Sequence, residues 1–189
     1  MEVRIPKSQK YTVEEFEALP ENERYELIDG ELYSLYAMGE PLRVHMELVM
    51  RLSNEIFNYI DSNKGDCRVY PAPFGVRLNE DEETVLEPDI SVICDREKLT
   101  EKGCTGAPDW VIEVVSPGNP AHDYLDKLKL YTEGGVREYW IVNPAKKSVT
   151  VYNSDDPYLP RSFTFEDRIK AGIYDDLYID FKALDEKIW

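Results

Sequence analysis

The sequence predicts an α+β domain whose core follows the order helix, three strands, helix, strand. Three observations lead to this prediction. Apolar residues recur at helical spacing between about Leu42 and Ile60. Short apolar segments that suit strands follow that helix. A second helix then begins and ends at clear capping signals. Added hairpins near the two ends of the chain complete the expected fold.

Length and composition favour a single domain spanning residues 1–189. The hydrophobic content of 42% is ordinary. No segment approaches the roughly twenty consecutive apolar residues that span a bilayer, and the first residues lack the apolar centre of a signal peptide. We therefore expect a cytoplasmic protein that does not associate with membranes.

The net charge sets a condition on any nucleic-acid role. The chain has 22 Lys and Arg against 38 Asp and Glu, a net charge of −16. Proteins that grip DNA by its backbone normally carry a basic surface. The charge therefore argues against a nucleic-acid substrate unless positive residues gather on one face. The candidates for such a rim are Arg43, Arg51, Lys129 and Arg137.

The cysteines favour a reducing compartment. Cys67, Cys94 and Cys104 cannot all pair within the chain, and none forms a Cys-x-x-Cys unit. With only two histidines, the composition argues against a structural zinc site. We therefore expect reduced, partly buried thiols.

Two local signals define the N-terminal elements. Thr12 and Glu15 match a capping box, which predicts a short helix starting at that point. An alternating pattern of apolar residues then continues on both sides of Asp29-Gly30, through Tyr25–Ile28 and Glu31–Leu35. This pattern is the strongest short-range signal for a β-hairpin.

The core elements follow. A helix is predicted from about Leu42 to Ile60, because its apolar residues form one stripe. Strands are predicted at about Arg68–Leu78, Leu86–Cys94 and Trp110–Val115. The stripe consists of Val44, Leu48, Leu52, Ile56 and Tyr59.

The second helix has an N-cap at Asn119, Pro120 at its first position and Gly134-Gly135 as its stop signal. Glu138–Val142 then predicts a buried strand. Further strand candidates, with weaker signals toward the end, are Ser148–Tyr152, Arg161–Phe165 and Leu177–Ile179.

Glu113 stands in the middle of an apolar strand. Because side chains alternate along a strand, Val111, Glu113 and Val115 share one face. A glutamate there is costly unless it is paired, hydrogen-bonded or bound to a metal. The alternative is a strand end at which Glu113 reaches water.

Asp89 follows Pro88 and leads a strongly apolar run. Taken alone, its position is more typical of a turn or strand start than of a ligand. Neighbouring strands would nevertheless bring Asp89 and Glu113 together, with carboxylates within about 6 Å, close enough to share one ion. Two carboxylates with water and phosphate oxygens suit magnesium, which can orient a water and stabilise charge on a phosphate.

A cation is the third part that phosphodiester cleavage needs. A Glu-x-Lys pattern would place it at position 115, which is Val115. Lys127 and Tyr131 on the following helix are four residues apart and share a face, with Asp123 one turn earlier. The alternative is an exposed Asp123–Lys127 pair worth about 0.3–0.5 kcal/mol.

These segments together resemble a known family. The resemblance is to the Uma-two family, restriction-endonuclease-like proteins within the PD-(D/E)XK nuclease superfamily, and it covers nearly the whole chain. Each motif alone is weak, but the combination is specific. The segments are Arg24–Leu32, Pro71–Phe74, Glu87–Val92, Gly106–Pro117, Asp123–Leu128 and Gly135–Pro144.

The resemblance implies a central mixed sheet flanked by helices, and a divalent-metal site with Asp89 and Glu113 at the metal-binding acidic positions. Lys127 matches the family lysine on the helix, and Tyr131 completes a motif found in some related nucleases. Two further positions match family residues that could approach the site, Glu31 and His45.

The expected function is a magnesium-dependent (or manganese-dependent) DNA endonuclease, with Asp89 and Glu113 as ligands and Lys127 as the catalytic cation. Small enzymes that cut both strands often act as symmetric dimers, so we expect a homodimer. One alternative is a catalytically silent nuclease-like module for binding or assembly, which the acidic charge favours. Another is a nuclease that acts on RNA or small nucleotides.

Overall fold

The computed structural model describes residues 10–20, 24–35, 43–78, 83–116 and 121–188. Its centre is a six-stranded sheet in the order β10-β9-β8-β7-β5-β3. β7 and β8 are parallel and the other neighbours are antiparallel, so the sheet is mixed. Its strands are β3 Arg68–Pro71, β5 Ile90–Ile93, β7 Trp110–Val114, β8 Glu138–Asn143, β9 Ser148–Asn153 and β10 Asp156–Thr164.

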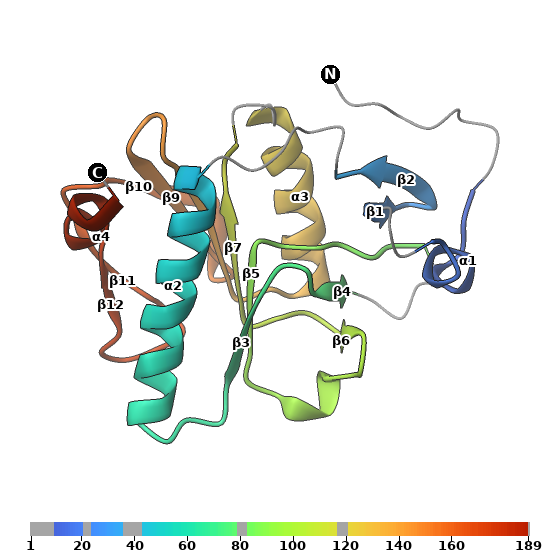
Figure 1. Cartoon of the computed structure of the whole chain (residues 1–189), viewed down its shortest axis with the longest axis horizontal. Helices are drawn as coiled ribbons and strands as arrows, with labels where there is room; N and C mark the ends of the chain where they lie inside the picture. The colour runs from blue at the N-terminus through green and yellow to red at the C-terminus, as the bar shows by residue number, and fades with distance from the viewer. Residues whose placement is uncertain (1–9, 21–23, 36–42, 79–82, 117–120, 189) are drawn as a thin grey trace.

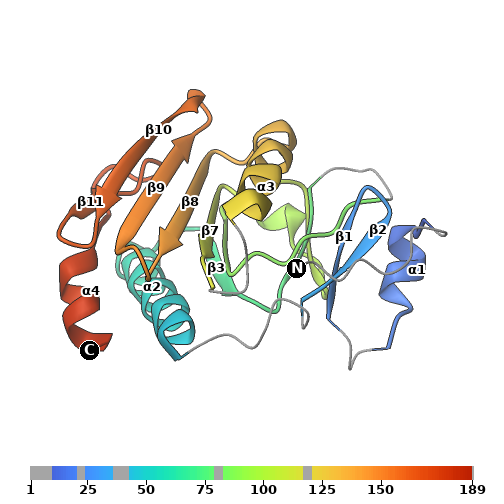
Figure 2. The same ribbon diagram turned by 90° about the horizontal axis from the view of Figure 1, so that it is seen from above.

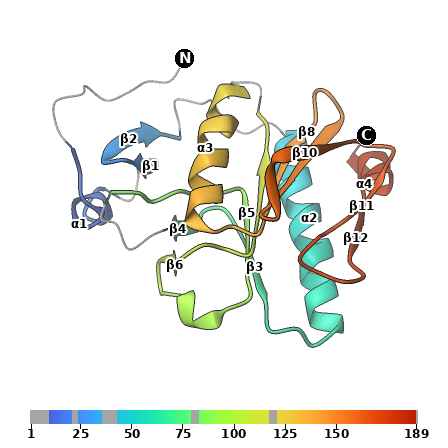
Figure 3. The same cartoon turned by 180° about the vertical axis from the view of Figure 1, so that it is seen from behind.

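Helices cover both faces of this sheet (Figures 1 and 2). α2 (Arg43–Ser62) and α4 (Phe181–Ile188) pack on one face and α3 (Ala121–Gly134) on the other. In the view from behind, α3 lies between the sheet and the N-terminal hairpin (Figure 3). Within the described ranges, no helix is long and apolar enough to cross a membrane.

Strand alternation divides the core into two clusters, one on each face of the sheet. Ile112 and Val114 of β7 point into the cluster beneath α2. Val111 points into the opposite cluster, where Tyr131 of α3 lies. Because Glu113 alternates with Ile112 and Val114, its side chain faces α3. This placement decides which helix supplies its partners.

The predicted N-terminal elements are confirmed. α1 (Val13–Glu17) starts at a capping box: the Glu15 amide donates to Thr12 Oγ1 at 3.2 Å, and the Thr12 amide to the Glu15 carboxylate at 2.9 Å. β1 (Tyr25–Ile28) and β2 (Glu31–Ser34) form the expected hairpin. Asp29 and Gly30 both have positive φ, 50° and 76°, as a type I′ turn requires.

The two core helices are also confirmed. In α2, Leu48, Leu52 and Ile56 are fully buried, so the predicted stripe faces the sheet. α3 ends at Gly134, and Gly135 has a φ of 92° that allows the Val136 amide to bond back to the Tyr131 carbonyl. The predicted start signals, Asn119 and Pro120, lie outside the described residues.

Two predicted strands are shorter than expected. The predicted strand Arg68–Leu78 is divided into β3 and β4 (Gly75–Arg77), and β4 pairs in parallel with β6 (Gly103–Thr105) outside the main sheet. The predicted strand Leu86–Cys94 enters the sheet only at Ile90. In both segments proline removes a backbone donor that a continuous ladder needs.

The C-terminal part contains a helix that we did not predict. A two-stranded sheet of β11 (Arg168–Lys170) and β12 (Tyr178–Asp180) leads directly into α4. The buried residues Phe181, Leu184 and Ile188 of α4 fall at helical spacing and close the cluster beneath α2. Three apolar positions over two turns are a weak signal for a helix, so the sequence does not predict α4.

The expectation of reduced cysteines is wrong for two of the three. Cys67 and Cys94 form a disulfide. They directly precede and follow the paired residues Arg68 and Ile93 of β3 and β5, so the antiparallel register places them opposite one another. Cys104 is free and buried, and burial raises the pKa of its thiol to about 12.

Candidate active site

Asp89 directly precedes β5 and Glu113 lies in β7, and these two strands are antiparallel neighbours. Ile90 pairs with Ile112, so the same register places Asp89 opposite Glu113. Asp89 Oδ2 accepts a 2.7 Å hydrogen bond from the Val114 amide, which fixes its carboxylate beside the end of β7. Burial, and to a lesser extent the charge of Asp89, raises the pKa of Glu113. The separation of about 6 Å between the two carboxylates stays a prediction.

Glu113 is only 4% exposed, so the alternative of a strand-end glutamate that reaches water is wrong. Its Oε1 atom accepts hydrogen bonds from Lys127 Nζ at 3.1 Å and from the Tyr131 hydroxyl at 2.8 Å. Burial raises the pKa of this carboxyl group, against the opposing effect of the Lys127 charge. Among the described residues, no hydrogen bond ends on Oε2, which leaves that atom for another ligand.

Lys127 is buried rather than part of an exposed helix pair, so that alternative is wrong as well. Its Nζ atom lies 2.7 Å from Glu26 Oε1 and 3.1 Å from Glu113 Oε1. Burial by itself lowers the pKa of a lysine, but the charges of the two carboxylates outweigh it and raise the pKa. The side chain therefore stays a cation at neutral pH.

Tyr131 is fully buried one turn further along α3. Burial and the nearby carboxylates raise the pKa of its phenol well above the ordinary value, so the hydroxyl keeps its proton and donates to Glu113. Its ring packs against Tyr139 with centroids 4.9 Å apart. The predicted four-residue spacing thus places Lys127 and Tyr131 on the same carboxylate oxygen.

His45 approaches Asp89 from α2. Its Nε2 atom lies 3.2 Å from both carboxylate oxygens of Asp89. Burial lowers the pKa of this histidine, but the bond to Asp89 and the charges of Asp89 and Glu113 raise it overall. Nδ1 is buried and has no hydrogen-bond partner among the described residues. The resemblance suggests two additional positions, Glu31 and His45. Of these, His45 is the one whose side chain contacts a candidate metal ligand, Asp89.

Glu31 is placed differently. Its carboxylate accepts a 3.4 Å hydrogen bond from Tyr33, two residues away on β2. In the described part of the chain, no hydrogen bond or ion pair connects Glu31 with Glu113 or Lys127. Its inclusion in the site stays a prediction.

Glu26 is the residue that sequence reasoning missed. It lies on β1, is 2% exposed, and its Oε1 accepts both the Lys127 ammonium at 2.7 Å and the Glu87 amide at 2.9 Å. It lies within a segment that the resemblance had already singled out. In a hairpin, however, a glutamate between two apolar residues is typical of an exposed face.

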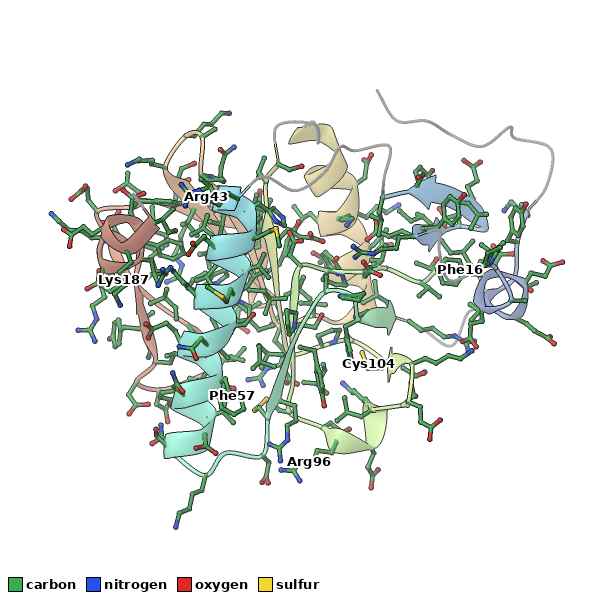
Figure 4. The ribbon with its side chains drawn as sticks, in the orientation of Figure 1. Phe16, Arg43, Phe57, Arg96, Cys104 and Lys187 are labelled. Atoms are coloured by element: carbon green, nitrogen blue, oxygen red, sulfur yellow. A yellow bond between two sulfur atoms is a disulfide. The ribbon has the colours of Figure 1, made fainter. Side chains whose placement is uncertain are left out.

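Each of the four cations predicted to form a positive rim lies beside a carboxylate. Arg43 and Arg51 both lie beside Glu47 on α2, at 3.9 and 3.0 Å. Figure 4 shows Arg43 near the end of α2 that lies beside α4, where its guanidinium also donates to the Ile188 carbonyl. Lys129 lies 3.9 Å from Glu133, and Arg137 3.0 Å from Asp109. These four cations are therefore compensated by neighbouring carboxylates.

The donor set fits a magnesium-like cation. Glu26 and Glu113 both contact the Lys127 ammonium, and the register of β5 and β7 places Asp89 opposite Glu113, so carboxyl oxygens gather here that could serve a divalent ion as ligands. Nowhere in the described ranges do three His, Cys, Asp or Glu side chains gather closely enough to hold a metal. A site with only the two carboxylates of Asp89 and Glu113 suits magnesium, which binds through one or two carboxylates and keeps several waters.

Known proteins resemble this chain in sequence and in fold. It is 28% identical over 153 residues to the uncharacterized protein slr1290 of Synechocystis, which covers 79% of this chain and 77% of that protein. Its structure matches the crystal structure of a putative nuclease of the DUF820 group from Anabaena variabilis, with a TM-score of 0.76 and 22% identity. That match covers 95% of this chain and 99% of the other, and it confirms the predicted mixed sheet flanked by helices.

The family comparison agrees with the motifs found in the sequence. The model of the Uma2 family, described as "Putative restriction endonuclease", matches residues 13–174. This span includes the hairpin that carries Glu26, the acidic residues Asp89 and Glu113, and α3. The chain therefore belongs to the Uma2 family of putative restriction endonucleases.

Proposed function

We propose that this protein is a magnesium- or manganese-dependent endonuclease that hydrolyses phosphodiester bonds in DNA, with Asp89 and Glu113 as the cation ligands. The observation that carries the proposal is the hydrogen-bonded cluster around Glu113, in which Lys127 and Tyr131 hold one carboxylate oxygen. Buried charge of this kind is costly, and perturbed ionisable groups concentrate at functional sites. Membership of the restriction-endonuclease-like family supports the same chemistry.

Asp89 and Glu113 would each offer the cation a carboxylate oxygen, and water and substrate phosphate oxygens would complete its shell. When bound, the cation would supply Lewis-acid stabilisation of the charge on the phosphate and lower the pKa of a bound water. The Val114 amide and His45 hold Asp89 in place. The Tyr131 hydroxyl holds Glu113 by one oxygen and leaves the other available.

Lys127 would act as a cation rather than as a base. Its raised pKa keeps the ammonium protonated, so it can donate to a phosphate oxygen or to the attacking water but cannot accept a proton. A fixed positive charge in a buried site stabilises the negative charge that develops during the reaction. A symmetric homodimer would supply one such site for each DNA strand.

A second candidate is a catalytically silent binding or assembly module. The compensated cations Arg43, Arg51, Lys129 and Arg137 favour it, because a DNA-binding enzyme needs uncompensated positive charge near its cleft. The two candidates differ in whether Asp89 and Glu113 bind a divalent ion.

Calorimetry with MgCl₂ or MnCl₂ tests the metal site. We expect the wild type to bind the ion and Asp89→Ala to lose binding. Asp61→Ala, which removes an exposed carboxylate at the end of α2, serves as the control. A wild type that binds neither metal would contradict the enzyme and favour the module.

Plasmid cleavage with added metal tests the reaction and its substrate. The wild type should nick or linearise the plasmid, and Glu113→Ala should not. Parallel incubations with single-stranded DNA and RNA distinguish the nuclease classes. If the protein cleaves only RNA, then RNA rather than DNA is its substrate, and the proposed metal chemistry still applies.

A further inference from the structure

The lysine of the site is shared between two carboxylates from different parts of the fold. Nζ of Lys127 lies closer to Glu26, at 2.7 Å, than to Glu113, at 3.1 Å. We propose that Glu26 is a positioning residue that draws Lys127 away from Glu113 and so keeps Glu113 available to a divalent cation. This inference rests on the proposed metal-dependent function.

Charge balance is the first argument. Without Glu26, Glu113 would be the single carboxylate left in contact with Lys127, and Asp89 alone would remain to balance a divalent cation. Burying an uncompensated charge is costly, so the lysine and the metal would compete for Glu113. With Glu26 present, the lysine has its own counter-ion and the other two carboxylates balance the metal.

The way in which Glu26 is held is the second argument. Its Oε1 atom also accepts the Glu87 amide at 2.9 Å, and Glu87 lies two residues before Asp89. The neighbouring Leu27 exchanges two backbone hydrogen bonds of 2.8 Å with Val85. The hairpin is thereby anchored to the segment that leads to Asp89, so Glu26 connects that segment to Lys127 on α3. A side chain this constrained can hold an ammonium in one place.

The hairpin is consequently part of the site rather than an accessory to it. β1 and β2 lie on the α3 side of the sheet, outside the six-stranded core (Figure 3). Glu26 reaches the cluster from there and is almost fully buried. It does not need to contact the cation in order to set how strongly the cation binds.

Titrating MnCl₂ into four proteins tests this role. Glu26→Gln should weaken Mn²⁺ binding at least about tenfold, the range found when residues that support metal ligands are replaced. Adding Lys127→Gln to that variant removes the competing ammonium and should restore Mn²⁺ binding to near the wild-type value, although the loss of the Lys127 cation abolishes cleavage. Glu14→Gln removes one exposed glutamate of α1 and should bind like the wild type.

The rescue separates positioning from a structural role. If Glu26 only stabilised the fold, the double variant would bind no better than Glu26→Gln, and that result would overturn the inference. Equal affinity of wild type and Glu26→Gln would also overturn it, with the proposed function intact. A wild type that binds no Mn²⁺ would overturn both. Thermal unfolding of each variant in EDTA establishes that folded proteins are being compared.

Discussion

Tyr131→Phe removes one hydroxyl from the candidate site and leaves the ring in place. The hydroxyl donates a 2.8 Å hydrogen bond to the buried carboxylate of Glu113. A hydrogen bond to a charged group contributes about 1.5–3 kcal/mol. At a pH above the raised pKa of Glu113, losing this bond leaves the buried carboxylate with one donor fewer. We therefore expect the free energy of unfolding to fall by about 1.5–3 kcal/mol. For a chain of this size, that corresponds to a fall of roughly 3–12 °C in the melting temperature.

Tyr174→Phe is a matched control. Its ring packs against Tyr59 with centroids 4.9 Å apart, the same separation as between Tyr131 and Tyr139. Its hydroxyl oxygen is buried, but it has no hydrogen-bond partner in the described part of the chain. Removing an unsatisfied hydroxyl should leave stability unchanged or slightly higher.

Urea and thermal denaturation in EDTA, monitored by circular dichroism, measure both variants under metal-free conditions. EDTA excludes any contribution of metal binding to stability. If the two variants unfold alike, or if Tyr131→Phe is as stable as the wild type, then the hydroxyl does not stabilise Glu113 and the account of the buried cluster is wrong.

Two further predictions concern parts of the fold away from the site. Burial raises the pKa of Glu138 above its ordinary value of 4.5, although hydrogen bonds from Trp140 and Ile173 oppose the rise. The unfolded chain thus loses this proton first as the pH increases. In urea denaturation, the stability of the wild type relative to Glu138→Gln should therefore fall as the pH rises above about 4.5, and a difference that does not change with pH would contradict this. The Cys67–Cys94 disulfide closes a loop with a sequence separation of 27, so replacing both cysteines by serine should lower the free energy of unfolding by roughly 3–4 kcal/mol. Dithiothreitol should lower the melting temperature of the wild type but not that of the double variant.

Local sequence signals correctly predicted those elements whose stabilising interactions form between residues close together in the chain. The capping box at Thr12 and the turn at Asp29-Gly30 were predicted and are present, because each depends on residues no more than three positions apart. The stripe of α2 was predicted for the same reason. α4 was not predicted, because its few apolar residues are a weak helix signal and their burial depends on contacts with α2 and the sheet.

Alternation along β7 was sufficient to single out Glu113 as a glutamate that needs a partner. The spacing of Lys127 and Tyr131 indicated a shared helical face. Which partner each side chain would find was beyond the sequence, since a strand and a helix can be read separately without knowing how they pack. The packing of α3 against β7 decided that both residues bind the same oxygen of Glu113.

The sequence by itself determined the class of fold, the hairpin, the two core helices and the acidic residue in the apolar strand, because these follow from local periodicity and capping. Only the tertiary structure decided that Glu26 enters the cluster and that Cys67 meets Cys94. Both contacts join residues far apart in the chain, across 101 and 27 positions. Their formation depends on how the hairpin docks and on strand register, and neither leaves a periodic trace in the sequence.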